Sequence, residues 1–424
     1  MDPKAVRSWI MYDWANSAFA TTIMAAVMPV FYKEVAGAGL AGNTAENYWG
    51  FTQTAAMILV AILCPILGAV ADYTGSKVRF LSVFMFIGAA SCVGMAFIGE
   101  DGWLLASILV VIGTIGFAAS NTFYDALLPS VSTPGTMNAV SNKGYAMGYL
   151  GGGLLLSANL VMILFYDKLG FPSKTAATQT VFATVGVWWI LFSLPVMRNV
   201  KEKAGAHVSG IDAAIGGGLA RIRATAGTLK RYPELLKYMA AFWFFNDGIN
   251  TVIVMATIYG SGIGIESNDL IAALLITQFV GYPSTLLFIK FARRIGIKPS
   301  IYSSLLVYVL IVILGFFMTS ALHFYLLAAL VGLVQGGSQA TARSLYAELV
   351  PPSRTAEFFG FLSLSSKFAS VAGPFVFSVV GTLTGSSRYG ILALLAFFII
   401  GIAILVAVNV EKGRQEALAG EAAS

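Results

Sequence analysis

The sequence predicts an all-α integral membrane protein with twelve transmembrane helices arranged as two six-helix repeats. Composition, the length of the apolar runs and a duplication of motifs support this fold class. Of the 424 residues, 58% are hydrophobic and 11% are charged, and the mean hydropathy is +0.80. Soluble domains carry about 25% charged residues, which excludes that class. The runs are also far longer than the roughly 10 residues of a transmembrane β-strand, so we expect helices.

Apolar stretches of about 20 residues can each cross a bilayer as one helix. Twelve such stretches occur, near 10–36, 50–71, 80–99, 103–129, 139–166, 177–197, 236–261, 269–291, 300–320, 322–350, 357–384 and 389–410. The longest connection divides them six and six. We therefore expect an N-terminal half (1–197), a linker (198–235), a C-terminal half (236–410) and a cytoplasmic tail (411–424).

The basic residues predict how the chain is oriented in the membrane. Threading the spans from a cytoplasmic N-terminus puts 21 of the 26 Lys and Arg residues on the cytoplasmic side and four outside, and leaves Arg343 within a span. This asymmetry follows the positive-inside rule. It predicts a multi-pass protein of the cell inner (plasma) membrane with both termini cytoplasmic and an uncleaved first span. The net charge of +6 then reflects these loops, and we expect no nucleic-acid partner.

Part of the linker has a helical pattern of its own. Between 209 and 230, apolar residues recur every three or four positions, at Ile211, Ile215, Leu219, Ile222, Ala226 and Leu229. This spacing predicts an amphipathic helix on the cytoplasmic surface of the membrane. A tether that joins the two halves is the favoured role, and a regulatory role is the alternative.

Two pairs of motifs show that the halves are related. "FYDALLP" (123–129) ends the fourth span and "LYAELVP" (345–351) ends the tenth, at an offset of 222 residues. "DYTGSKVRF" (72–80) follows the second span and "RRIGIKPSI" (293–301) follows the eighth, at an offset of 221. Nearly equal offsets indicate a duplicated six-helix unit. Parallel repeats of this size are the architecture of the major facilitator fold, in which the substrate site lies between the halves.

The stretch "GAVADYTGSKVR" (68–79) resembles the loop signature of major facilitator transporters. Five residues match the signature: Gly68, Asp72, Gly75, Lys77 and Arg79. Tyr73 and Thr74 depart from it. The resemblance implies a gate in which Asp72 holds the seam between the halves closed, and a carboxylate at a helix terminus or beside an arginine is stabilised there. The second-half copy carries Arg293 in place of the aspartate, so we expect one such clasp.

A narrower resemblance rests on three first-half motifs. "YDWANSAF" (12–19), "TFYDALLP" (122–129) and "NKGYAMGYLGGG" (142–153) together resemble the autophagy-related vacuolar effluxer branch of this superfamily. The branch includes bacterial members of unknown substrate. The resemblance extends over essentially the whole chain and implies efflux of amino acids, leucine-like ones in the eukaryotic relatives.

Ionisable residues inside the predicted spans mark a candidate site. They are Asp13, Asp125, Asp247, Arg343 and, near a helix end, Glu348. All five lie on spans one, four, seven and ten, the spans that line the cavity in this fold. Because a charge that faces lipid is costly, each should face the bundle interior or a water-filled cavity.

Neutral polar residues extend this candidate site. In span one, Asp13 belongs to a stripe of polar and small residues at helical spacing, and in span ten two glutamines and Arg343 recur every fourth residue. The predicted cavity residues are Asp13, Asn16, Asn121, Tyr124, Asp125, Asp247, Asn250, Gln335, Gln339 and Arg343. In span five, glycines spaced four apart (Gly144, Gly148 and Gly152) predict close helix packing.

We hypothesise that Arg343 pairs with Asp13, Asp125 or Asp247 in one access state and exchanges partners in another. A buried aspartate without its partner could carry a proton. A substrate carboxylate could compete for the guanidinium in bidentate geometry. The alternative is that these ion pairs only fix helix packing.

Three functional classes remain in comparison. A secondary transporter explains both the duplication and the cavity charges. An enzyme would need a catalytic cluster, but His207 falls in the middle loop and His323 at an outer turn, and neither has an acidic partner in the sequence. There is also no phosphate-binding loop, and Cys64 and Cys92 lie inside apolar runs. We therefore expect no enzyme activity, cofactor, metal site or disulfide. A transporter-fold scaffold without flux stays open.

Among transported solutes, an amino acid is favoured, because a zwitterion matches a site with both an arginine and carboxylates. Exporters of lipids, sugars or drugs stay open. Protons are a candidate coupling ion, and the sequence does not give the direction of transport. The expected partners are a small-molecule substrate and the lipid bilayer, and we expect a functional monomer because each chain contains both halves of the pore.

Overall fold

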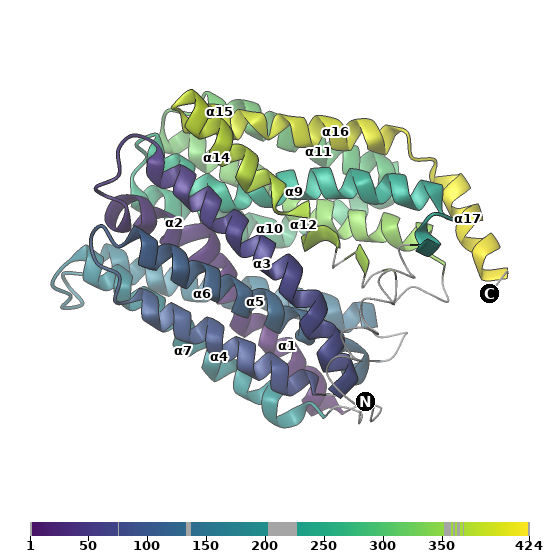
Figure 1. Ribbon diagram of the computed structural model, residues 1–424, viewed down its shortest axis with the longest axis horizontal. Coiled ribbons are helices and arrows are strands. Elements are labelled where there is room, and N and C mark those ends of the chain that lie inside the picture. Colours follow the sequence, from purple (N-terminus) through teal and green to yellow (C-terminus); the bar gives the residue numbers. More distant parts are fainter. Residues whose placement is uncertain are drawn as a thin grey trace.

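The computed structural model is an elongated bundle of roughly parallel helices (Figure 1). It describes residues 2–74, 76–132, 137–201, 227–351, 358, 361–362, 365–367 and 369–422. The elements are α1 (Pro3–Ala18), η1 (Phe19–Ala26), α2 (Val27–Phe31), η2 (Tyr32–Ala36), α3 (Thr44–Thr74), α4 (Lys77–Met95), α5 (Trp103–Val131), α6 (Met137–Leu164), α7 (Lys174–Asn199), α9 (Pro233–Gly262), α10 (Ser267–Ile295), α11 (Ile297–Phe316), α12 (Ala321–Leu349), α14 (Ala372–Thr384), α15 (Ser387–Ala393), α16 (Leu395–Val406) and α17 (Val410–Ala422). The segments η1 and η2 are wider, π-helical turns.

Twelve stretches among the described residues are helical, long and apolar enough to cross a membrane. The predicted all-α class and number of spans are confirmed. The first span is one continuous run from α1 to η2, Pro3–Ala36. It begins earlier than the predicted 10–36, because Asp2 caps its first turn by accepting a hydrogen bond from the Lys4 backbone N–H.

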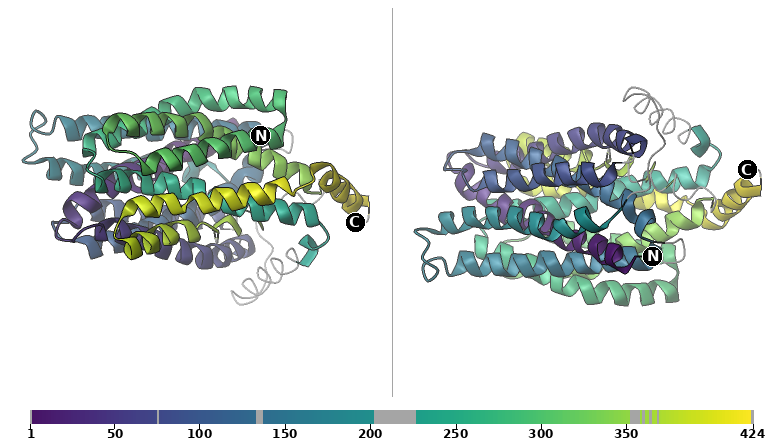
Figure 2. Two further views of the ribbon diagram at one scale, coloured as in Figure 1. Left: turned by 90° about the horizontal axis from the view of Figure 1, so that it is seen from above. Right: turned by 90° about the horizontal axis from the view of Figure 1, so that it is seen from below.

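The helices form two groups that lie side by side. In Figure 1, α1 and α4–α7 lie below, and α9–α12 and α14–α16 lie above. Between the groups, α3 packs on α14 and α6 packs on α10. Both chain termini lie at one end of the bundle, in Figure 1 and in both views of Figure 2. We call this the proximal end and the opposite one the distal end.

The predicted linker lies almost entirely outside the described residues. The helix α7 continues to Asn199 and α9 begins at Pro233, so these two spans reach further into the connection than predicted. The amphipathic helix predicted for 209–230 is described only from residue 227 onward, and the division of the chain into halves and linker stays a prediction. In the predicted tail, α17 docks through an ion pair of 2.7 Å between Arg414 and Glu348.

Backbone contact between helices fixes the N-terminal group. A Cβ atom on Gly116 of α5 would lie 2.6 Å from the backbone nitrogen of Gly88 on α4 and 2.8 Å from the carbonyl oxygen of Phe84. The obstructing atoms belong to the backbone, which cannot rotate away as a side chain can. Glycine is therefore required at this crossing.

We expect Gly116→Ala to lower the free energy of unfolding by about 1–3 kcal/mol, the usual cost of overpacking. Gly153→Ala is the matched control, because a Cβ there would have ordinary contact at 4.0 Å from Gln278. Thermal unfolding of both purified variants in detergent checks this. Equal midpoints for the two variants would contradict the backbone-contact argument.

Candidate functional site

The two helix groups are closed against each other at the distal end. Three hydrogen bonds cross the seam there: Asn43 Nδ2 to the Gly381 carbonyl (2.7 Å), Trp49 Nε1 to the Val254 carbonyl (3.3 Å) and Lys174 Nζ to Ser267 Oγ (2.8 Å). The Thr257 hydroxyl also donates to the Ala25 carbonyl, which joins α9 to span one. The distal ends of both groups therefore meet.

Toward the proximal end, charged side chains are open to solvent. Asp125 on α5 and Arg343 on α12 are both exposed. Asp125 is nevertheless surrounded by protein atoms, so solvent reaches it through a cleft. A hydrogen bond of 2.6 Å from Lys367 Nζ to Thr122 Oγ1 crosses the seam at this level. The structure is thus packed at its distal end and accessible near its proximal end.

Four charged residues act on one another in this cleft. The positive charge of Arg343 acts on both Asp13 and Asp125, and Lys367 also acts on Asp125. The two aspartates lie near enough for their charges to interact as well. We call Asp13, Asp125, Arg343 and Lys367 the charge cluster. It draws two carboxylates from one half and two cations from the other, so it spans the seam.

The carboxylate of Asp13 is held by its neighbours. The Tyr124 side chain lies close enough to act on it, and the Tyr124 ring stacks on Trp9 with centroids 4.1 Å apart. Glycines of α6 close over it, since a Cβ atom would lie 3.1 Å from Asp13 Oδ2 if placed on Gly144, and 3.4 Å from Oδ1 if placed on Gly148. The predicted close packing of these glycines is confirmed, and its consequence is that α6 forms a wall behind Asp13.

The polar stripe of span one has two parts. Asp13, Ser17 and Ala20 are half-buried, whereas Asn16 is buried. The Asn16 amide donates to the Asn121 side-chain oxygen and so joins α1 to α5 beside the cleft. In this conformation these two predicted cavity residues contact each other, which sets the spacing of the helices that carry Asp13 and Asp125.

Asp247 has a different environment from the charge cluster. It is 2% exposed, and its Oδ2 accepts from the Gly373 backbone N–H at 2.8 Å, while Thr251 Oγ1 lies 3.4 Å from Oδ1. Gly373 is in the first turn of α14, where unpaired backbone N–H groups attract a carboxylate. The structure therefore brings Asp13 and Asp125 to Arg343, whereas Asp247 caps a helix.

The remaining amides lie on the same helices as the charges. Asn250 and Gln339 are half-buried. Gln335 lines a mostly apolar pocket of the C-terminal group, together with Thr277 and Gln278, and Ala25 of the first span also lines it. Sequence reasoning missed Lys367, which had been counted with the cytoplasmic segments and helix ends. Its position inside the predicted span 357–384 was the available signal.

The predicted gate is described only in part. The backbone of Asp72 lies in the last turn of α3, but its side chain and all of Gly75 lie outside the described residues. Gly68 faces α5, since a Cβ there would be 4.0 Å from Thr122. Lys77 is half-buried and Arg79 is exposed. The gating role of these five residues stays a prediction.

Comparison with known proteins agrees with this arrangement. Residues 44–137 and 134–418 match the model of the family described as "Vacuole effluxer Atg22 like". The chain belongs to this effluxer family. A similar protein is the uncharacterized MFS-type transporter YxiO of Bacillus subtilis (strain 168), 36% identical over 410 residues, which are 96% of this chain and 95% of that protein. Autophagy-related protein 22 of Cryptococcus neoformans is 28% identical over 303 residues, 67% of this chain and 52% of that protein.

Solved structures show the fold. The inward open conformation of the xylose transporter XylE from E. coli matches with a TM-score of 0.65 at 14% identity, over 98% of each chain. A bacterial homologue of the human lysosomal transporter Spinster matches with a TM-score of 0.67 at 14% identity, over 99% of this chain and 98% of that one. The family match and the 36% identity to an MFS-type transporter, together with the twelve candidate spans among the described residues, make the chain a multi-pass membrane transporter of the major facilitator type. Its relatives are transporters, not enzymes.

We expect Asp247→Ala to lower the free energy of unfolding by about 1–3 kcal/mol, because the buried Gly373 N–H would lose its acceptor. Asp247→Asn should lose less, since an amide oxygen can still accept. Asn250→Ala, one helical turn away, is the control. Thermal unfolding in detergent measures all three, and an Asp247→Ala midpoint equal to that of the control would show that the cap does not stabilise the fold.

Proposed function

We propose that the protein is a secondary transporter that exports a zwitterionic amino acid by alternating access. The charge cluster carries this proposal. An amino acid presents a carboxylate, which Arg343 can bind in bidentate geometry with Lys367 nearby, and an ammonium group, which Asp13 and Asp125 can accept. A sugar or an apolar drug offers neither a carboxylate for Arg343 nor an ammonium group for the two aspartates.

The direction of access supports a transport cycle. The distal seam is closed by hydrogen bonds, and the cleft opens toward the proximal end. Alternating access moves one repeat against the other around a fixed site. In the opposite state the distal hydrogen bonds break, and the proximal seam closes over the charge cluster, beginning from the contact between Lys367 and Thr122.

The positive-inside rule places the proximal end in the cytoplasm of a cell with a single plasma membrane. The conformation described above is then inward-facing, and export begins with a solute entering from the cytoplasm. The family description names an effluxer, and export from the cell is the direction that we propose by analogy with it.

Proton coupling follows from the same residues. When the solute occupies Arg343, an aspartate that had paired with the guanidinium loses that partner. A carboxylate in this position can take up a proton instead of remaining charged. Protons are therefore the coupling ion that we propose, and the chain is expected to function as a monomer.

A ligand screen on purified protein tests the solute class. We expect an amino acid present at about 100 times its dissociation constant to stabilise the wild type by about 2.7 kcal/mol. Arg343→Ala should lose this stabilisation, while Arg294→Ala should keep it, because Arg294 is an exposed arginine at the proximal end of α10. Thermal shift with amino acids, short peptides, sugars and organic acids, at two pH values, provides the measurement.

Stabilisation of Arg343→Ala equal to that of the wild type would make Arg343 a packing residue and remove the amino-acid assignment. A response to sugars alone would also overturn it. A positive result leads to flux assays in proteoliposomes with the same solute, in which binding without flux would support the scaffold alternative.

Cysteine labelling tests the orientation. Lys168→Cys at the distal end and Lys201→Cys at the proximal end both replace exposed lysines. We expect a membrane-impermeant maleimide to label only the first variant in intact cells and both after permeabilisation. The native Cys64 and Cys92 are buried and give little background. Labelling of Lys201→Cys in intact cells would reverse the proposed topology.

A further inference from the structure

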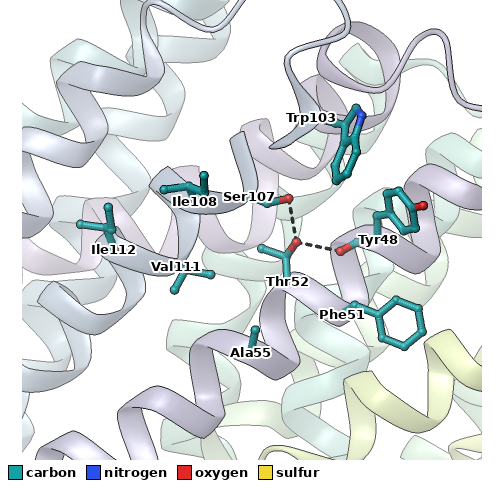
Figure 3. Close-up of a pocket in the computed structure, with 9 residues that line it drawn as sticks. All are labelled: Tyr48, Phe51, Thr52, Ala55, Trp103, Ser107, Ile108, Val111 and Ile112. Carbon is teal, nitrogen blue, oxygen red and sulfur yellow. Dashed lines mark hydrogen bonds between the residues drawn. The ribbon is translucent and has the colours of Figure 1, made fainter. Parts of the chain in front are cut away.

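A groove of about 500 Å³ lies between α3 and α5, away from the charge cluster (Figure 3). Tyr48, Phe51 and Ala55 line it from α3, and Trp103 and Val111 are among the residues that line it from α5. Both helices are membrane spans, and the lining residues belong to their distal halves. The transport site already described contains none of these residues.

The groove opens toward the lipid-facing surface. Ile108 of α5, which lines the groove, is 48% exposed. Ile62, two helical turns beyond Ala55 on α3, is 51% exposed. Ala55 is also exposed. Large apolar side chains exposed on a membrane span face hydrocarbon. In a bilayer, the molecule that covers this surface is therefore a lipid.

The walls select an apolar occupant. The hydroxyl of Thr52 lies 2.7 Å from the Tyr48 carbonyl oxygen and 2.9 Å from Ser107 Oγ (Figure 3). Ser107 Oγ is also 2.8 Å from the hydroxyl oxygen of Tyr32. These polar groups are thus engaged with one another. The other lining groups are aromatic rings and aliphatic side chains.

The length of the groove corresponds to one leaflet. The ten residues from Trp103 to Ile112 are nine helical steps and extend about 13.5 Å at the rise of 1.5 Å per residue. This length is close to the ~15 Å that one leaflet contributes to the hydrocarbon core. At the distal end of the groove, the rings of Tyr48 and Trp103 lie 4.8 Å apart. Tyr and Trp residues are enriched at the level of lipid headgroups.

We propose that this groove binds one acyl chain of a phospholipid from the distal leaflet, with the headgroup beside Tyr48 and Trp103. The bound chain packs against Phe51, whose ring contacts Phe375 of α14 edge-on at 6.4 Å across the seam. An occupied groove therefore buttresses the seam between α3 and α14 and stabilises the distally closed conformation.

Photolabelling in proteoliposomes tests this site. The probe is a phosphatidylglycerol that carries a diazirine in one acyl chain, and mass spectrometry maps the labelled residues. We expect labelling of Phe51 and Val111 to exceed that of exposed residues on α4 about tenfold, equivalent to about 1.4 kcal/mol of preferential binding. Equal labelling over all lipid-facing residues would mean ordinary annular lipid and would overturn the proposal.

A matched pair of variants separates the groove from the general surface. Ala55→Phe fills the groove with a ring, while Ala90→Phe adds the same ring to an exposed position on α4. We expect the label at Val111 to be lost in the first variant and retained in the second. Retention in both, with unchanged unfolding midpoints, would show that no chain occupies the groove.

Discussion

Lipid cannot solvate Asp13, Asp125 and Arg343, so the helices that carry them must turn these side chains toward one another. This requirement places spans one, four and ten around the seam and creates a cleft there instead of a dry core. The carboxylates come from one half and the cations Arg343 and Lys367 from the other. The electrostatic attraction therefore acts across the boundary along which the halves can move.

Close helix packing and hydrogen bonds, more than ion pairs, hold the distal seam together. A Cβ atom on Gly50 would collide with the Ser378 hydroxyl and lie 3.1 Å from the Pro374 carbonyl oxygen, so glycine favours the close approach of α3 to α14. Hydrogen bonds such as that between Asn43 and the Gly381 carbonyl then form at normal length. Such contacts are individually modest, and a set of them can therefore close the seam firmly and still be broken once per transport cycle.

The penultimate span connects these two regions. Its distal part, α14, begins at Ala372 and is capped by Asp247, whereas Lys367 precedes a turn at 370–371 and reaches Thr122. Asp247, which the sequence suggests is a cavity charge, thus caps the start of α14 after this turn. One described part of this span thus contacts the distal seam, and the other contributes Lys367 to the charge cluster.

The sequence alone determined the twelve spans and the duplicated architecture, and it named Asp13, Asp125 and Asp247 as candidate partners of Arg343. The length of an apolar run can be counted directly in the sequence. A charged residue inside a span must face the bundle interior or a water-filled cavity, because facing lipid is costly. The tertiary structure decided that Asn16 pairs with Asn121, that Asp247 caps α14 and that Lys367 joins the charge cluster. These contacts depend on how helices far apart in the chain are rotated and spaced. When most residues of a span are apolar, its hydropathy pattern does not show which face points into the bundle.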